Sequence, residues 1–205
     1  MRFVAFALAF IFITDNGADA IDENEQIGLC ARRFSVARKY TIYELEGIWF
    51  PQYRTRNKSN FQYKCHILYE TSGKDDGIST LDVHSYFMAN DTVRKAPYSV
   101  SYRTDLDKGL LIETADVEGI GEIRIYNFVL KSTKQYRVRY VCTDYIYVAK
   151  VNFNNVYIET RSMKPELEVI NEAVGVIRKS NLSHIILDKI DQKNCKRPTF
   201  YNGYE

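Results

Sequence analysis

The chain is organised as a succession of short segments in which apolar and polar residues alternate. Eight such segments occur between residues 47 and 160, separated by polar or glycine-containing turns such as Asn90-Asp91. Alternation with a period of two is typical of strands that bury one face. The expected strands are Gly47–Thr55, Phe61–Thr71, Ile78–Ala89, Ala96–Thr104, Gly109–Ala115, Glu122–Leu130, Gln135–Thr143 and Asn155–Thr160. Eight antiparallel strands joined by short turns favour an all-β, up-and-down β-barrel, which has no free sheet edge and has room for one small ligand.

One later segment changes from strand spacing to helical spacing. The pattern predicts an amphipathic helix of about four turns that begins at Pro165-Glu166 and ends near Lys179. A helix with a single apolar stripe has to lie against another surface, and we expect that surface to be the outer wall of the barrel. The residues of the stripe are Leu167, Ile170, Ala173, Val174 and Ile177.

The first residues have the pattern of a secretory signal peptide. Arg2 precedes an unbroken apolar run from Phe3 to Ile13, and small residues stand at Ala18 and Ala20. The run is too short for a membrane span, which needs about 20 residues. We therefore expect residues 1–20 to be removed and residues 21–205 to form one secreted, extracellular domain without a transmembrane segment.

All four cysteines follow this leader. An even number of cysteines in a secreted chain predicts two disulfides, for which three pairings are open. No CxxC pair is present, so no zinc site is expected, and a net charge of +2 gives no electrostatic reason to expect nucleic acid. Three sequons predict N-glycosylation on exposed loops. The asparagines concerned are Asn57, Asn90 and Asn181.

Two motifs resemble the lipocalin family, and within it the branch that contains apolipoprotein D and the arthropod bilin- and retinoid-binding lipocalins. Gly47-Ile48-Trp49 stands where the family has Gly-x-Trp at the start of the first strand, after a helical-looking approach over residues 34–43. Arg161 follows the last strand, just before the helix. In the family this arginine stacks on the tryptophan and closes the barrel floor, a cation–π contact worth about 2 kcal/mol when desolvated. The resemblance covers essentially all of the expected mature chain and implies a barrel with one helix packed outside.

The resemblance also implies a disulfide pairing and contains one departure. By resemblance, Cys30 pairs with Cys142 and Cys65 pairs with Cys195. The family's middle motif, Thr-Asp followed by an aromatic residue, falls where this chain reads Ser132-Thr133-Lys134-Gln135-Tyr136, so the aspartate is missing. We therefore expect a different turn there, and the resemblance carries no receptor contact over to it.

The disulfides determine which strand side chains point into the barrel. Cys65 and Cys142 have to face outward to reach segments outside the barrel, and successive side chains of a strand point to opposite faces. The opposite arrangement of the seventh strand, with its aromatics inside and its arginines in water, stays open because β-bulges reset the alternation. The residues placed inward are His66, Leu68, Arg137, Arg139 and Val141.

Inward arginines would need a carboxylate partner, because a buried unpaired charge is costly. The partner could be the carboxylate of a ligand, such as a fatty acid or a bilin propionate, held by a bidentate guanidinium. It could equally be Glu159 on the neighbouring strand. Asn155 and Tyr157 share a face with Glu159, and Tyr53 follows Trp49 at even spacing, so all three are expected to line the interior.

The sequence therefore predicts a carrier or scavenger of a small hydrophobic molecule, namely a fatty acid, sterol, retinoid, carotenoid or bilin, with no obligatory cofactor. The alternative is a protein-binding or amine-sequestering lipocalin that acts through its loops or its interior without lipid transport. An enzyme is not expected, because no cysteine is left over as a nucleophile and no Ser/His/Asp spacing forms a triad. His66 has no supporting motif, so it is expected to line the interior as an ordinary polar residue, in preference to binding haem.

Overall fold

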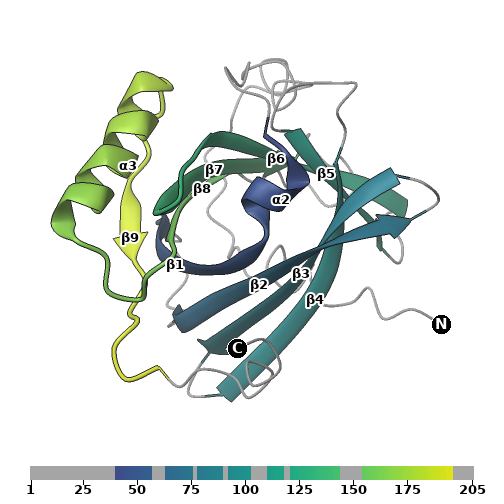
Figure 1. The fold of residues 1–205 in the computed structure, drawn as a ribbon, viewed down its shortest axis with the longest axis horizontal. Coiled ribbons are helices and arrows are strands. Elements are labelled where there is room, and N and C mark those ends of the chain that lie inside the picture. Colours follow the sequence, from purple (N-terminus) through teal and green to yellow (C-terminus); the bar gives the residue numbers. More distant parts are fainter. Residues whose placement is uncertain are drawn as a thin grey trace, which may run out of the picture.

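In the computed structural model the strands form one antiparallel sheet that closes into a barrel (Figure 1). The structure describes residues 40–56, 63–75, 78–89, 92–102, 110–117, 121–143 and 154–195. Consecutive strands pair with one another, and β1 pairs with both β8 and β2, which closes the ring. The predicted eight-stranded up-and-down barrel is therefore confirmed. Its strands are β1 (Gly47–Thr55), β2 (Tyr63–Asp75), β3 (Ile78–Ala89), β4 (Thr92–Tyr102), β5 (Leu110–Val117), β6 (Gly121–Ser132), β7 (Tyr136–Thr143) and β8 (Asn154–Thr160).

A bulge in β1 reverses the alternation of its side chains. The register with β8 shifts between Pro51 and Tyr53, so that Pro51 lies opposite Glu159 but Tyr53 lies opposite Ile158. Directly opposed residues of two strands point to the same face. Tyr53 therefore shares the outer face with Ile158, and the prediction that it lines the same inner wall as Trp49 is wrong. The even spacing of the two aromatics misled because one extra residue is inserted between them.

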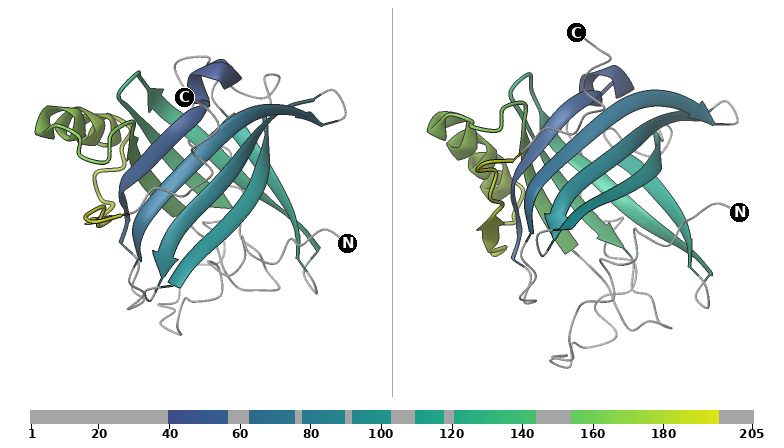
Figure 2. Two further views of the ribbon diagram at one scale, coloured as in Figure 1. Left: turned by 60° about the horizontal axis from the view of Figure 1, so that its bottom comes forward. Right: turned by 90° about the horizontal axis from the view of Figure 1, so that it is seen from below.

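A short helix and a long one flank the barrel at different places. The short helix α2 (Ile42–Leu45) lies at one end of the barrel, where it leads into β1 (Figure 2). The long helix α3 (Leu167–Lys179) packs on the outer wall against β7 and β8, as predicted (Figure 1). Its buried residues are Val169, Ile170, Ala173 and Ile177.

Leu167 is a correction to the predicted stripe, since it is 74% exposed. The helix begins at Leu167 after the N-cap residue Glu166, and the buried face starts at Val169 instead. At the other end, Asn181 adopts a left-handed backbone conformation with φ 58°, and the N–H of Leu182 donates to the carbonyl oxygen of Ile177 at 3.1 Å. This arrangement ends the helix, as left-handed residues commonly do.

The segment after α3 returns to the barrel and is fastened there. β9 (Leu187–Lys189) pairs with β1 outside the ring, and the predicted disulfide between Cys65 and Cys195 is present with its sulfur atoms 2.05 Å apart. The side-chain nitrogen of the buried residue Gln192 donates to the carbonyl oxygens of Pro51 at 2.7 Å and His66 at 2.8 Å. Both carbonyls belong to bulged stretches, in β1 and β2 respectively. Gln192 thus supplies the hydrogen bonds that the two bulges take away from the ladder.

Several predictions fall on residues outside the described part of the chain. They are the signal peptide over residues 1–20, the sequons at Asn57 and Asn90, and the cysteine Cys30. Cys142 is disulfide-bonded, and its pairing with Cys30 stays a prediction. Asn181 is exposed at the end of α3, and its glycosylation also stays a prediction. None of the helices in the described ranges is long and apolar enough to cross a membrane.

Candidate functional site

One end of the barrel is closed by Trp49, which is fully buried. Its indole nitrogen donates to the carbonyl oxygen of Leu45 in α2 at 2.7 Å. Two guanidinium groups lie over its ring, that of Arg161 at 3.5 Å from the ring centroid and that of Arg137 at 4.4 Å. The predicted stacking of Arg161 on Trp49 is therefore confirmed, and Arg137 adds a second cation that the motif did not indicate.

Gly47 allows Arg161 to reach this position. Its φ of +90° lies in the region that favours glycine, and a Cβ atom there would lie 2.9 Å from Nη1 of Arg161. The same Nη1 donates to the carbonyl oxygen of Ile48 at 2.9 Å. The glycine of the Gly-x-Trp motif is thus required both by the backbone and by the close approach of the arginine.

Above this floor lies a buried ionic network of four side chains. Nη1 and Nη2 of Arg137 each donate to one carboxylate oxygen of Glu70 at 2.5 Å, and Nε of Arg137 donates to Glu159. Arg139 donates to Glu159 through Nε at 3.0 Å and through Nη2 at 2.5 Å. The inward arrangement of the two arginines is the one found, and two protein carboxylates balance their two charges.

The arginines keep Glu159 ionised. Burial raises the pKa of this carboxyl group, but Arg137 and Arg139 outweigh burial and lower the pKa from 4.5 to about 2. A ligand carboxylate would therefore have to displace Glu159 or Glu70 to form a bidentate pair with these arginines. Of the two partners considered from the sequence, Glu159 is the one present, and it is joined by Glu70.

Higher on the same inner face, His66 forms a buried pair with a serine. Its Nε2 lies 2.9 Å from Oγ of Ser85, and its ring meets the ring of Phe87 edge-on at 6.1 Å. Burial lowers the pKa of His66 from 6.5 to about 3, against the opposing effect of Glu159. The imidazole is therefore neutral and a weak base, so the pair is poorly suited to activate Ser85 as a nucleophile. Among the described side chains, no group of three His, Cys, Asp or Glu residues could hold a metal ion.

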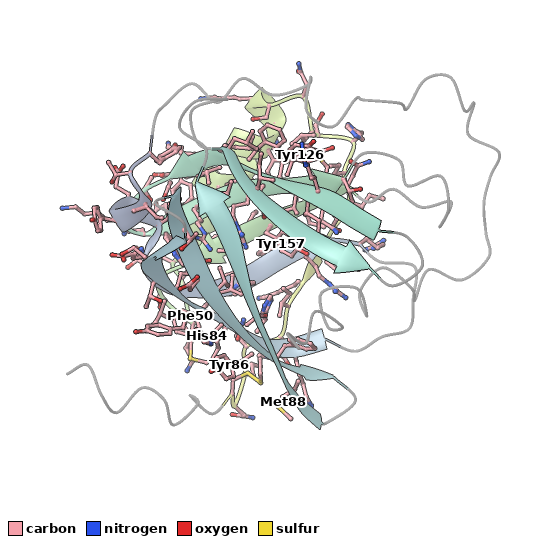
Figure 3. All side chains as sticks on the ribbon, turned by 90° about the vertical axis from the view of Figure 1, so that its right-hand side faces the viewer. Phe50, His84, Tyr86, Met88, Tyr126 and Tyr157 are labelled. Carbon is pink, nitrogen blue, oxygen red and sulfur yellow. A yellow bond between two sulfur atoms is a disulfide. The ribbon has the colours of Figure 1, made fainter. Side chains whose placement is uncertain are left out.

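Three other predicted lining residues share the inner face. Leu68 lies opposite Trp49 and is fully buried. Tyr157 lies opposite Arg139, whose guanidinium is 5.8 Å from its ring centroid, and Asn155 lies opposite Val141. Figure 3 shows Tyr157 inside the barrel. His84, Tyr86 and Met88 lie on the outer face of β3.

Glu70, Ser85 and Asn127 are among the inner-face residues that were not identified from the sequence, and the signals for them differ. Glu70 stands two residues after Leu68, so extending the alternation of β2 would have found it. Ser85 and Asn127 lie opposite Leu68 and Val141, and only the strand register reveals this. No local motif marks either of them.

The turn between β6 and β7, where the family motif is altered, is closed by Thr133. Its backbone N–H donates to the carbonyl oxygen of Tyr136 at 2.8 Å, and its hydroxyl accepts a hydrogen bond from the backbone N–H of Tyr136 at 3.0 Å. The carbonyl oxygen of Gln135 accepts a hydrogen bond from the backbone N–H of Arg161 at 2.9 Å. The hydroxyl of Thr133 thus holds this turn in place, and the turn accepts a hydrogen bond from the backbone of Arg161.

Comparison with protein-family models and with curated proteins found no match to this chain. Solved structures do match it. Insecticyanin from the tobacco hornworm Manduca sexta is 19% identical with a TM-score of 0.59, over 79% of this chain and 87% of that one. Lipocalin 12 from rat epididymis is 16% identical with a TM-score of 0.57, over 80% and 91%. Lobster apocrustacyanin A1 is 18% identical with a TM-score of 0.55, over 74% and 79%.

Proposed function

Because this chain has the lipocalin fold, we propose that it is an extracellular carrier or scavenger of one small hydrophobic molecule held inside the barrel. The observation that supports the proposal most directly is the division of the inner face. One end is plugged by Trp49 and the ionic network, whereas the inner face beyond carries apolar side chains such as Phe87, Leu111 and Val141 together with the neutral polar side chains of His66, Ser85 and Asn127. Removing apolar ligand surface from water would drive binding at roughly 25 cal/mol per Å². The apolar residues of the whole inner face include Leu68, Val83, Phe87, Leu111, Val129 and Val141.

Organic extraction of the secreted protein tests this proposal. The extract is analysed by mass spectrometry, and the intact protein by its absorption spectrum. A lipid or pigment present in proportion to the protein supports the carrier. An extract without such a molecule, together with no binding of lipids or pigments by the extracted protein, would overturn it.

A protein-binding role without a carried ligand is the second candidate. Many of the described inner side chains are almost completely shielded from solvent, with Leu68 and Val83 at 1% and Val129 at 0% exposure, whereas Asn155 and Tyr157 are half-buried. An eight-stranded barrel can be filled by its own side chains. A secreted protein that yields no lipid but co-purifies with one partner protein in fixed proportion would favour this role.

Sequestration of an amine has less support. It needs an inward carboxylate that can meet a cation. Glu70 and Glu159, the inward carboxylates among the described side chains, are both held by arginines. An amine would have to replace a guanidinium that already donates two hydrogen bonds.

The proposal includes secretion, the Cys30–Cys142 disulfide and glycans on the three sequons. Sequencing of the mature N-terminus should begin near Ile21, and peptide mapping under non-reducing conditions should recover Cys30 joined to Cys142. A mature protein that retains residues 1–20, or a free thiol at Cys142, would contradict these points. The narrower resemblance to the branch with apolipoprotein D stays a prediction.

A further inference from the structure

Asn127 on β6 has a buried amide nitrogen without a hydrogen-bond partner. The residue is 4% exposed, and it lies opposite Val141 on the inner face. Its Oδ1 accepts a hydrogen bond from Nη1 of Arg139 at 3.4 Å, which places the amide oxygen on the arginine side. The nitrogen Nδ2 has no acceptor within reach. A buried donor in this state is costly unless an acceptor is supplied, and one that arrives with a ligand would satisfy it.

The charges beside Asn127 decide which kind of acceptor fits. Arg137 is held by Glu70 and Glu159, and Arg139 by Glu159, so the two positive charges face two negative ones. An incoming carboxylate would meet Glu159 as well as the arginines. Burying an anion that has no cation of its own costs far more than burying a neutral carbonyl or ester oxygen. The network therefore favours an uncharged acceptor.

Apart from Arg139, which meets the amide oxygen, the inward residues directly opposite Asn127 are apolar. Leu111 from β5 and Val141 from β7 stand opposite Asn127 on its two neighbouring strands, and Val129 is the next inward residue of β6. All three are buried. A molecule that reaches Nδ2 would therefore place one oxygen there and apolar atoms around it.

We propose that Nδ2 of Asn127 donates a hydrogen bond to a carbonyl, ester or hydroxyl oxygen of an uncharged apolar ligand, and that Arg137 and Arg139 do not form an anion site. This inference rests on the proposed carrier function, and it narrows the ligand class from hydrophobic molecules in general to neutral ones. Fatty acids and bilin propionates, which the inward arginines suggested from the sequence, are thereby disfavoured.

Two matched pairs of ligands test the inference. Methyl hexadecanoate is compared with hexadecanoic acid, and retinal with retinoic acid, each by displacement of the neutral fluorescent probe N-phenyl-1-naphthylamine from extracted protein at neutral pH. We expect the neutral member of a pair to bind about tenfold more tightly than the acid, or better.

Two variants of Asn127 provide the control for the hydrogen bond. Asn127→Asp has nearly the same shape and keeps the oxygen that Arg139 meets, but it loses the donor and adds a negative charge, so Asn127→Leu is the variant without added charge. Asn127→Leu removes both polar atoms. Each should weaken binding of the neutral ligand about tenfold, the effect of one lost hydrogen bond. Asn127→Leu should also unfold at the same temperature as the wild type or higher, because it removes an unpaired buried donor.

The outcomes separate this inference from the carrier function. Tighter binding of the acids, or unchanged affinity for the neutral ligands in both variants, would overturn the inference and leave the carrier standing. If neither pair displaces the probe and no ligand is extracted from the secreted protein, the carrier proposal fails and the inference fails with it.

Discussion

The ionic network allows the effect of one substitution to be worked out. Arg137→Met removes the bidentate partner of Glu70, which is buried and 1% exposed. Glu159 keeps Arg139, but Glu70 loses both guanidinium hydrogen bonds. Removing one member of a buried ion pair costs roughly 3–5 kcal/mol, because the remaining charge is left without compensation. For a domain of this size that corresponds to a fall in Tm of roughly 6–20 °C.

A second substitution distinguishes the energetic coupling between Arg137 and Glu70 from a simple loss of packing around Arg137. Arg137→Met combined with Glu70→Met replaces the pair by apolar side chains, an exchange that is often neutral or stabilising. The double variant should therefore recover at least half of the stability that Arg137→Met loses. Urea unfolding followed by far-UV circular dichroism gives the free energies, and the fluorescence of Trp49 reports the floor. A loss below about 1 kcal/mol for Arg137→Met, or losses that simply add in the double variant, would refute the reasoning.

Three further substitutions test other parts of the structure. His66→Gln should flatten the dependence of stability on pH between 6.5 and about 3. The imidazole of the unfolded chain takes up a proton near pH 6.5, whereas the buried imidazole does so only near pH 3. The free energy of unfolding of the wild type therefore falls by up to about 5 kcal/mol as the pH falls through this window. The exposed His84→Gln is the matched control in urea unfolding across pH, and an equal slope in wild type and His66→Gln would contradict the assignment. Gly47→Ala should cost about 1–3 kcal/mol in thermal unfolding, since φ is +90° and the new Cβ would lie 2.9 Å from Nη1 of Arg161; an unchanged Tm would show that the floor adapts. Gln192→Leu should cost about 1–3 kcal/mol because two buried carbonyls lose their donor, and a neutral effect would mean that water replaces it.

The strands could be predicted well wherever alternation and turn residues agree. β1 and β3 have the predicted bounds, Gly47–Thr55 and Ile78–Ala89. β4 was expected to start at Ala96 but starts at Thr92, which lies opposite Ala89. The charged residues that begin β4 hide its alternation, so the turn at Asn90-Asp91 was the better guide to its start.

The side chains of the inner face could be predicted in part. The prediction fails where a β-bulge changes the alternation of a strand. Cys65 gave the correct parity for His66 and Leu68 because its disulfide partner lies outside the barrel. The outward direction expected for Cys142 also gave the correct parity for the arginines of β7. In β1 no such marker follows Trp49, and the bulge moved Tyr53 to the outer face. Bulges depend on how a strand fits its neighbours, so a single strand's sequence seldom reveals them.

The floor also explains why the arginines cannot be read as a ligand site from one strand alone. Arg137 and Arg139 on β7 look like an unpaired cationic patch until the register brings in Glu159 from β8 and Glu70 from β2. Arg137 in addition donates to the carbonyl oxygen of Leu45 at 3.4 Å, the same oxygen that the indole of Trp49 binds. The network thus ties α2, the indole and three strands together at the closed end. The ionic network blocks the closed end, so it limits how deep an apolar molecule can enter the barrel. Each described charge of the network faces an opposite charge, so the network does not attract an anion.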